Sequence, residues 1–256
     1  MDSFPISFLL YLPIGCILGL FRMGIWVAML AADKAWLTDN DFMIKFLQGV
    51  LGVQVDWVGS ERIPSQRHVL VSNHVTAGDL MILYRRPQHY VHLISTAIPQ
   101  AVAEAKNHRV RLVHASPESY NALAERIHTD PVHLFPEGGM TNGKGMMKFS
   151  RGFLRFGKDL PIVPVALRCT APWGLQTHTL TSSFLANLFW FCFLPWVRLE
   201  ATVLEPCRMQ EGEGKGAFAE RVQHAIAREL QVGICDLTLQ QKRQLAKGIK
   251  PKSAAR

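Results

Sequence analysis

The sequence predicts an α/β fold in which a mostly parallel sheet is flanked by helices. Short apolar runs that suit buried strands alternate along the chain with stretches that suit helices, and this alternation favours parallel strands joined by helical crossovers. The chain has 256 residues, of which 48% are hydrophobic, which is enough for a full core in one domain. An uncharged apolar stretch at residues 3–21 comes before this pattern and predicts an N-terminal membrane anchor.

The anchor is expected over residues 1–36. Arg22 separates two apolar stretches, and each is shorter than the roughly 20 residues that a spanning helix needs. Because Pro13 and Gly15 interrupt the first stretch, we favour a hairpin or re-entrant anchor. One tilted span that tolerates Arg22 is an alternative. A cleaved signal peptide is another, although neither a basic start nor a clear cleavage site accompanies the apolar run.

The predicted sheet falls within a domain at residues 37–210. Its strands are short runs rich in β-branched, Leu and aromatic residues, expected at 53–59, 69–71, 90–94, 132–135, 162–167 and 199–204. Its helices are expected at about 38–49, from residue 80 onward and at 117–127. The aromatic-rich run 184–199 contains Pro195 and two tryptophans, and it predicts a second contact with the bilayer. A plain core helix is the alternative.

Residues 211–256 are predicted to form an amphipathic helix and a basic tail. Apolar residues recur every four positions from Phe218 to Leu230, which predicts a helix at 215–231 that packs on the core. The tail after Asp236 carries Lys and Arg without an acid, so we expect it to be solvated or drawn to anionic headgroups.

Charge and cysteine content narrow the class of partner. The net charge of +8 favours phospholipid surfaces or phosphorylated substrates, and no recognition motif supports nucleic acid as a partner. The five Cys are widely spaced and include no Cys-x-x-Cys pair, so neither a zinc site nor a disulfide framework is expected. Cys169 is interpreted as core packing.

The first candidate site follows the strand at 69–71. His74 and Asp79 lie at the turn where this strand ends. An aspartate can hold an imidazole in one tautomer, and the imidazole can then take a proton from a hydroxyl. Taken alone, this spacing also fits an unconnected His and Asp on a surface turn.

The second candidate site follows the strand at 132–135. Here Phe135-Pro136 leads into Glu137-Gly138-Gly139, and glycines let a ligand approach backbone amides. A basic stretch follows and offers positive charge for a phosphate from Lys144, Lys148 and Arg151. A surface loop with solvated basic side chains is the alternative interpretation.

Together these blocks resemble the glycerolipid (lysophospholipid) acyltransferase family, which is PlsC-like. The resemblance rests on Asn73-His74 followed by Asp79, on the Phe-Pro-Glu-Gly string, and on the step Ile162-Val163-Pro164-Val165. It covers roughly residues 50–205. The stretch 141–153 looks like the lysophosphatidylcholine acyltransferase branch. The apolar start also resembles the ancient ubiquitous protein subgroup, whose members carry a hairpin anchor and lie on endoplasmic reticulum and lipid droplets.

The resemblance implies a site and a reaction. His74 would be the general base and Asp79 its orienting partner in transferring an acyl group from acyl-CoA to a lysophospholipid hydroxyl. Glu137, Gly138 and Gly139 would shape the acceptor pocket, and the basic residues would hold phosphate. Backbone amides near the turn would stabilise the oxyanion. Acyl-CoA would be a co-substrate, with no metal or other cofactor, and the catalytic domain would face the cytosol.

The sequence departs from the family pattern in two places. Gly139-Met140 stands where relatives usually have Thr followed by a basic or polar residue. The family's second block has no clean match between residues 90 and 116, where Arg109 and Arg111 are the nearest substitutes. These departures support the alternative of a catalytically weak or inactive scaffold that keeps the fold.

Overall fold

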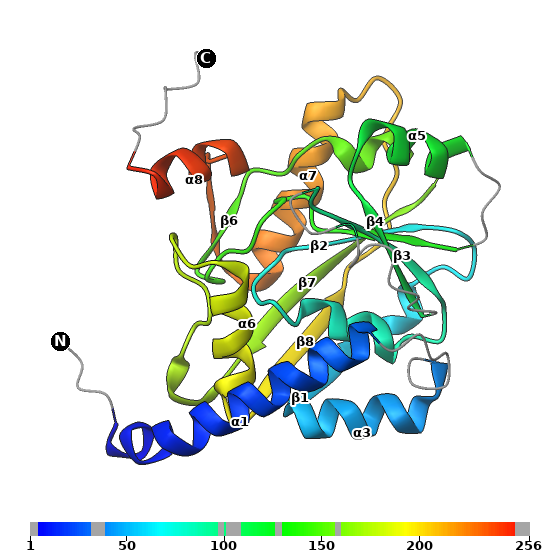
Figure 1. Cartoon of the computed structure of the whole chain (residues 1–256). Helices are drawn as coiled ribbons and strands as arrows, with labels where there is room; N and C mark the ends of the chain where they lie inside the picture. The colour runs from blue at the N-terminus through cyan, green and yellow to red at the C-terminus, as the bar shows by residue number, and fades with distance from the viewer. Residues whose placement is uncertain are drawn as a thin grey trace.

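The computed structural model describes residues 5–31, 39–96, 100, 109–125, 130–156 and 160–248. The predicted ends of the anchor at 1–4 and 32–36, the end of the helix at 126–127 and the basic tail at 249–256 lie outside these residues. Within them, a sheet is covered by helices on both faces, as Figure 1 shows.

The main sheet has seven described strands and is mostly parallel, as predicted. They lie in the order β1 (Val53–Val58), β8 (Val197–Val203), β7 (Ile162–Thr170), β2 (Val69–Ser72), β5 (Val132–Leu134), β3 (Tyr90–Ile94) and β4 (Val110–His114). Neighbours are parallel except for β7 and β8. The sequence interpretation missed β4 and the small parallel pair of β6 (Gly145–Met147) and β9 (Gly233–Cys235).

Two apolar cores lie on the two faces of this sheet. Residues of β2 alternate between them: Leu70 belongs to one core, while Val69 and Val71 belong to the other. This explains why the strand is a continuous apolar run, since a strand buried on both faces has no polar side. The run 162–167 in β7 has the same character.

Helices divide between the two faces (Figure 1). One face carries α1 (Ile6–Ala31), α3 (Asp41–Leu51), the 3-10 helix η2 (Asp79–Arg85) and α6 (Phe184–Phe193). The other carries α5 (Pro117–Glu125), the 3-10 helix η3 (Gly152–Phe156) and α7 (Lys215–Leu230). The predicted helix from residue 80 is therefore a short 3-10 helix. The helical part of the predicted run 184–199 ends at Phe193, because β8 begins at Val197.

The predicted hairpin is wrong for the described residues, because α1 is one continuous helix with Pro13 inside it. It packs along α6 and is held near its start by Tyr11, whose hydroxyl donates to the carbonyl of Phe193 at 2.7 Å. Residues 6–29 are long and apolar enough to cross a membrane, and most of them are not buried in the fold. The divisions predicted at residues 36 and 210 stay predictions.

Arg22 does not break this helix or reach toward solvent, since it is only 5% exposed. Its Nη1 donates to the carbonyls of Leu194 at 2.6 Å and Cys192 at 3.3 Å, and its Nε donates to that of Val50 at 2.8 Å. The carbonyls of the last helical turn have no partner within their own helix. Arg22 therefore closes the end of α6 and ties α1 to α3.

We expect Arg22→Gln to destabilise the domain, because a shorter neutral side chain cannot reach all these carbonyls. Hydrogen bonds from a charged donor each contribute about 1.5–3 kcal/mol, so we expect a loss of at least about 2 kcal/mol in the free energy of unfolding. Chemical denaturation in detergent measures it. Arg85→Gln, at an exposed arginine, is the matched control. Equal stability of the two variants would show that Arg22 is not a structural tie.

Candidate active site

The candidate site lies at the carboxyl ends of parallel strands. His74 follows β2 and Glu137 follows β5, which is the neighbour of β2 in the sheet. In open α/β sheets ligands bind outside these strand ends. Asn73 ties the turn to β7 on the other side, where its side chain exchanges two hydrogen bonds with the backbone of Leu167, at 2.7 and 2.8 Å. The buried asparagine thus continues the pairing of β2 with β7 after the strand has ended.

His74 and Asp79 are brought together as predicted. His74 Nδ1 lies 2.8 Å from Asp79 Oδ2, and the carboxylate is fully buried while the imidazole is 19% exposed. Asp79 also accepts hydrogen bonds from the backbone N–H groups of Val75 and Thr76 and from the Thr76 hydroxyl. With so many donors the carboxylate is an acceptor for the Nδ1 proton of His74. This tautomer leaves Nε2 free to accept a proton.

The imidazole is fixed from a second direction by Phe135. The two rings stack at 4.0 Å with an angle of 3° between their planes. Behind Phe135 lie two buried histidines, His92 and His133, whose Nδ1 atoms are 2.8 Å apart. His133 Nε2 is 3.1 Å from the hydroxyl of Ser72. Sequence reasoning missed this pair, although both residues sit inside predicted strands where a polar side chain is unusual.

Glu137 is placed behind the turn and not in an open pocket. Its two carboxylate oxygens accept hydrogen bonds from the backbone N–H of His74 at 2.9 Å and of Met147 at 2.8 Å. Burial raises the pKa of Glu137 to about 7, while those two N–H groups and the charge of Lys242 oppose the rise. The side chain thus positions His74 against β6.

The remaining predicted residues are scattered. Lys148 forms an ion pair with Asp236 at 2.9 Å, the Arg151 guanidinium lies near Gly216 of α7, and Lys144 is exposed. Their charges do not meet at one described point. Gly138 and Gly139 lie beneath Leu239 of α8 (Leu239–Ala246), a helix that the sequence interpretation did not identify.

Gly78 gives the turn its contact with α6. A Cβ atom at this position would overlap the ring of Phe191, which is fully buried. The spacing from His74 to Asp79 therefore includes a residue that only glycine fits.

Most backbone N–H groups of the turn already have acceptors within the protein. The backbone N–H groups of residues 74, 75, 76, 78 and 79 all donate within the protein. That backbone amides near the turn stabilise the oxyanion stays a prediction.

The two arginines named as substitutes for the family's second block do not lie at the site. Arg109 is buried and donates to the carboxylate of Asp41 at 2.8 Å and to the carbonyl of Asp39 at 2.9 Å, so it secures the start of α3. Arg111 is exposed on β4.

Burial raises the pKa of Cys169 to about 12, which makes its thiol a poor nucleophile and fits the packing role. Among the described residues, no group of three His, Cys, Asp or Glu side chains is arranged to hold a metal.

The sequence interpretation also missed Lys242 and His178 at the site. Lys242 Nζ donates to the carbonyl of Met140 and lies 2.7 Å from His178 Nε2. Burial and the charge of Lys242 lower the pKa of His178 to about 4. The string from Thr238 to Gln241 forms a capping box, and this signal predicts a helix start just before Lys242.

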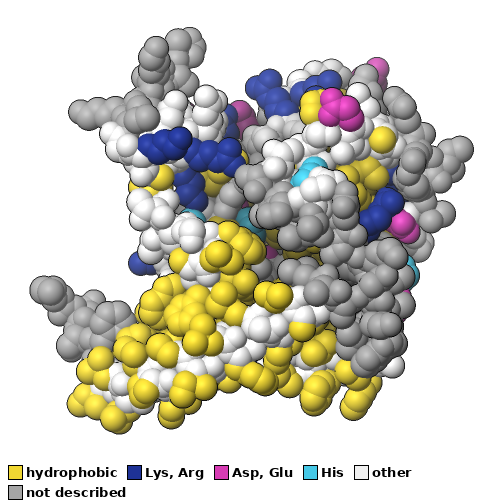
Figure 2. Space-filling model, in the orientation of Figure 1, with side chains coloured by type: hydrophobic (Ala, Val, Ile, Leu, Met, Phe, Trp, Pro, Cys, Tyr) yellow, Lys and Arg dark blue, Asp and Glu magenta, His cyan; other side chains and the backbone are white. Residues whose placement is uncertain are grey.

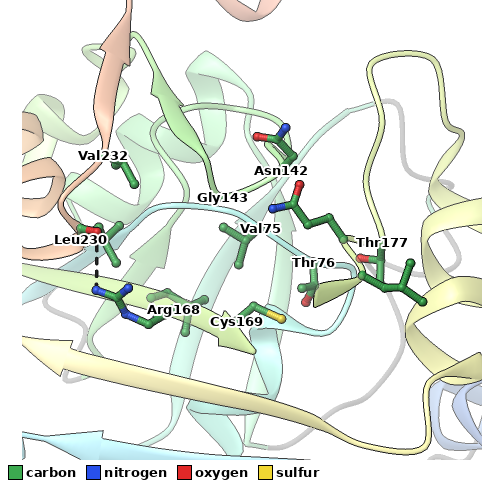
Figure 3. A pocket seen from close by; sticks show the side chains of 12 residues that line it. Val75, Thr76, Asn142, Gly143, Arg168, Cys169, Thr177, Leu230 and Val232 are labelled. Carbon is green, nitrogen blue, oxygen red and sulfur yellow. Dashed lines mark hydrogen bonds between the residues drawn. The ribbon is translucent and has the colours of Figure 1, made fainter. Parts of the chain in front are cut away.

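A cavity of about 170 Å³ adjoins the catalytic turn, as shown in Figure 3. It is lined by residues 75–76, 142–143, 167–169, 175–177, 230 and 232. Thr177 is buried, and within the described part of the chain its hydroxyl has no hydrogen-bond partner. Typical ligand pockets hold roughly 300–1,000 Å³, so this cavity suits a small polar group.

The buried histidine pair predicts a pH dependence of stability. Burial lowers the pKa of His92 to about 3, so the unfolded chain binds the extra proton below about pH 6.5 and stability falls as the pH falls. Glu137 acts in the opposite direction between about pH 4.5 and 7, because its folded pKa is raised.

We therefore expect His92→Gln to lose less stability than the unchanged protein between pH 7 and pH 5. The difference should be about 2 kcal/mol, from 1.36 kcal/mol per pH unit over roughly 1.5 units. Chemical denaturation at the two pH values measures it, and Glu137 is common to both proteins. His89→Gln, at an exposed histidine, should show no such difference. A full pH effect in His92→Gln would rule out this histidine as its source.

Comparison with known proteins agrees with the fold and with an acyltransferase domain. A family model described as acyltransferase matches residues 54–168. The lipid droplet-regulating VLDL assembly factor AUP1 of Rattus norvegicus is 29% identical over 261 residues, covering 97% of this chain and 62% of that protein. The glycerol-3-phosphate acyltransferase 3 of Xenopus laevis is 23% identical over 211 residues, covering 77% and 47%. The chain thus spans about three fifths of the length of AUP1 and about half of the length of the glycerol-3-phosphate acyltransferase.

A solved structure shares the fold. The 1-acyl-sn-glycerophosphate acyltransferase PlsC from Thermotoga maritima matches with a TM-score of 0.61 at 15% identity, covering 86% of this chain and 97% of that one. The matched residues 54–168 contain His74, Asp79 and Glu137. The predicted resemblance to the PlsC-like acyltransferase family is therefore confirmed for the domain at residues 54–168.

Proposed function

We propose that this protein transfers a fatty acyl group from acyl-CoA to the hydroxyl of a lysophospholipid or related glycerolipid. The observation that carries the proposal is the pairing of His74 with a buried Asp79 at 2.8 Å. A carboxylate that accepts from backbone amides and from the imidazole at once has a fixed position. It therefore orients a base toward a bound hydroxyl.

In the proposed step, His74 Nε2 takes the proton of the acceptor hydroxyl while that oxygen bonds to the thioester carbonyl carbon. The carbon–sulfur bond then breaks, and the sulfur leaves with the proton as the thiol of coenzyme A. No covalent acyl-enzyme is needed. That the reaction uses neither a metal nor a cofactor stays a prediction.

Association with a membrane surface is part of the proposal. Large apolar side chains are exposed along α1 and continue onto α3 and α6, and Figure 2 shows this apolar region along the lower side of the molecule. The exposed set includes Ile6, Leu9, Leu10, Ile17, Leu20, Phe21, Phe42, Phe46, Leu185 and Trp190. Contiguous apolar surfaces of this kind mark contacts with partners or membranes. Because α1 is tied to the domain along its length, it would lie in the interface and not cross the bilayer.

A second function is kept because specific observations favour it. The AUP1 relatives are named as lipid droplet-regulating factors, and α8 packs on a Gly139-Met140 loop that departs from the family pattern. A catalytically weak or inactive scaffold on endoplasmic reticulum or lipid droplets would keep the fold and the apolar surface. In either case we propose that the catalytic domain faces the cytosol.

The reaction is tested with detergent-extracted protein, acyl-CoA and a panel of lysolipids. We expect His74→Ala to lower acyl transfer by about 10²–10⁴-fold, because the proton acceptor is lost. Asp79→Asn should cause a loss of the same order through the wrong tautomer. His89→Ala is the control, at an exposed histidine. Full activity of His74→Ala would overturn the mechanism, and an inactive unchanged protein across the panel would favour the scaffold.

Membrane binding is tested by flotation with phospholipid vesicles. We expect Ile17→Glu with Leu20→Glu to weaken binding by about tenfold or more, because each exposed aliphatic side chain buried in lipid contributes about 1.5 kcal/mol or more. Val58→Glu with Ile234→Glu is the matched control, at exposed apolar positions outside α1, α3 and α6. Equal losses in the two double variants would contradict a membrane face on α1.

A further inference from the structure

Part of the cavity wall lies on a loop between β7 and α6. Leu175, Gln176 and Thr177 line the cavity that adjoins the catalytic turn, and these three residues belong to no helix or strand. No ladder of backbone hydrogen bonds fixes them, so their position depends on where the loop is attached at its two ends. We call residues 171–178 the strap, which Figure 1 shows between β7 and α6.

One end of the strap is attached to α1. Trp173, in the 3-10 helix η4 (Pro172–Gly174), packs against two aromatic rings of α1, with ring centroids 5.3 Å from that of Phe8 and 5.4 Å from that of Tyr11. Its indole N–H also donates to the hydroxyl of Ser7 at 3.1 Å. Trp173 thus joins the strap to the first turns of α1.

The backbone at Trp173 depends on these contacts. Trp173 has a φ of 58° and a ψ of 12°, which lie in the left-handed region that a bulky side chain rarely adopts. A residue keeps such a conformation only when its surroundings hold it there. Gly174 beside it also has a positive φ, of 64°, with open space around it. Without the indole against Phe8 and Tyr11, we expect the chain at residues 173–174 to relax and the strap to shift.

The other end of the strap is attached close to the general base. His178 is buried, with its Nδ1 3.1 Å from Nδ2 of Asn187 and its Nε2 2.7 Å from Nζ of Lys242. Lys242 in turn donates to the carbonyl of Met140, in the loop that follows Glu137. His178 is close enough to His74 for that imidazole to contribute to its lowered pKa. The strap therefore runs from α1 to the surroundings of the base.

The turns of α1 that hold the strap also face outward. Phe8 and Tyr11 are three residues apart, so they lie on the same side of the helix, toward Trp173. Leu9 and Leu10 come between them in the sequence and are 58% and 72% exposed. They belong to the apolar surface that is proposed to meet the membrane. One helical turn thus connects that surface to the strap.

We propose that Trp173 is a positioning residue that makes the cavity wall beside the catalytic turn depend on the packing of α1. This inference rests on the proposed acyl transfer and on the proposed membrane face of α1, and it adds a link between the two. A site whose wall is in place only when α1 is packed against the domain ties the reaction to the surface where a lipid substrate lies.

The test follows the thiol of Cys169, which lies in the same cavity wall near the end of β7. The full chain in detergent is treated with iodoacetamide, and the labelling rate of each cysteine is read by mass spectrometry. We expect Trp173→Ala to speed the labelling of Cys169 about tenfold or more, because a displaced strap exposes this half-buried thiol. Phe8→Ala removes the partner ring on α1 and should have the same effect.

Three comparisons separate a shift of the strap from a general loosening of the fold. Cys207, which is half-buried and outside the cavity, should label at an unchanged rate in Trp173→Ala. Trp196→Ala, at an exposed tryptophan, is the matched control and should leave the labelling of Cys169 unchanged. Trp173→Phe keeps an aromatic ring against α1 and should restore most of the protection. In the acyl-transfer assay, Trp173→Ala should lower the rate about tenfold or more and Trp173→Phe should recover it, because small displacements beside the reacting groups are costly.

Each outcome decides the proposal. Faster labelling of Cys169 alone, with slower acyl transfer and recovery of both in Trp173→Phe, supports it. An unchanged rate at Cys169 overturns it, and so does equal acceleration at Cys169 and Cys207, which would make Trp173 an ordinary packing residue. Faster labelling at full activity overturns the positioning role. If the unchanged protein transfers no acyl group, the proposed reaction fails by itself, and the labelling rates still decide whether the cavity wall depends on α1.

Discussion

The buried carboxylate of Asp79 is the constraint on which the site depends. A buried charge is costly unless hydrogen bonds satisfy it. Here the donors are two backbone N–H groups, one hydroxyl and the imidazole of His74, all from the five residues before Asp79. The turn must adopt the one conformation that brings these donors to the carboxylate. The backbone conformation of the turn therefore also fixes the position of His74.

The turn is held from both sides by residues that do no chemistry. Asn73 binds the backbone of β7 and Glu137 binds the backbone of His74 and Met147, so three parallel strands and β6 are linked through side chains. Phe135 and the histidine pair behind it then fix the plane of the imidazole. Motif residues that look like candidates for substrate contact are in this protein mostly supports for His74.

The sequence predicted those features that depend on residues close together in the chain. The strands that carry the site and the pairing of His74 with Asp79 follow from apolar runs and from a separation of five residues. The elements β4, β6 and β9 escaped prediction, and the three-residue strands β6 and β9 form only by pairing with each other, which no local pattern marks. The structural role of Glu137 also escaped, since it depends on Met147, which joins it only after β6 has formed. The histidine pair joins two strands that are 41 residues apart in the sequence.

The positively charged residues show why some contacts could not be predicted from the sequence. Arg22 lies inside an apolar run, and Lys242 lies in a tail without acids. In both contexts the sequence predicts a side chain that contacts lipid headgroups. Their partners lie 172 and 102 residues away, at Leu194 and Met140. In both cases the acceptors are backbone carbonyls, which every residue has and which no sequence pattern marks. Such a carbonyl attracts a distant cation only where the fold leaves it without a partner, as at the end of α6. A net charge of +8 therefore indicates an anionic partner in general, while the fold decides which cations remain available to it.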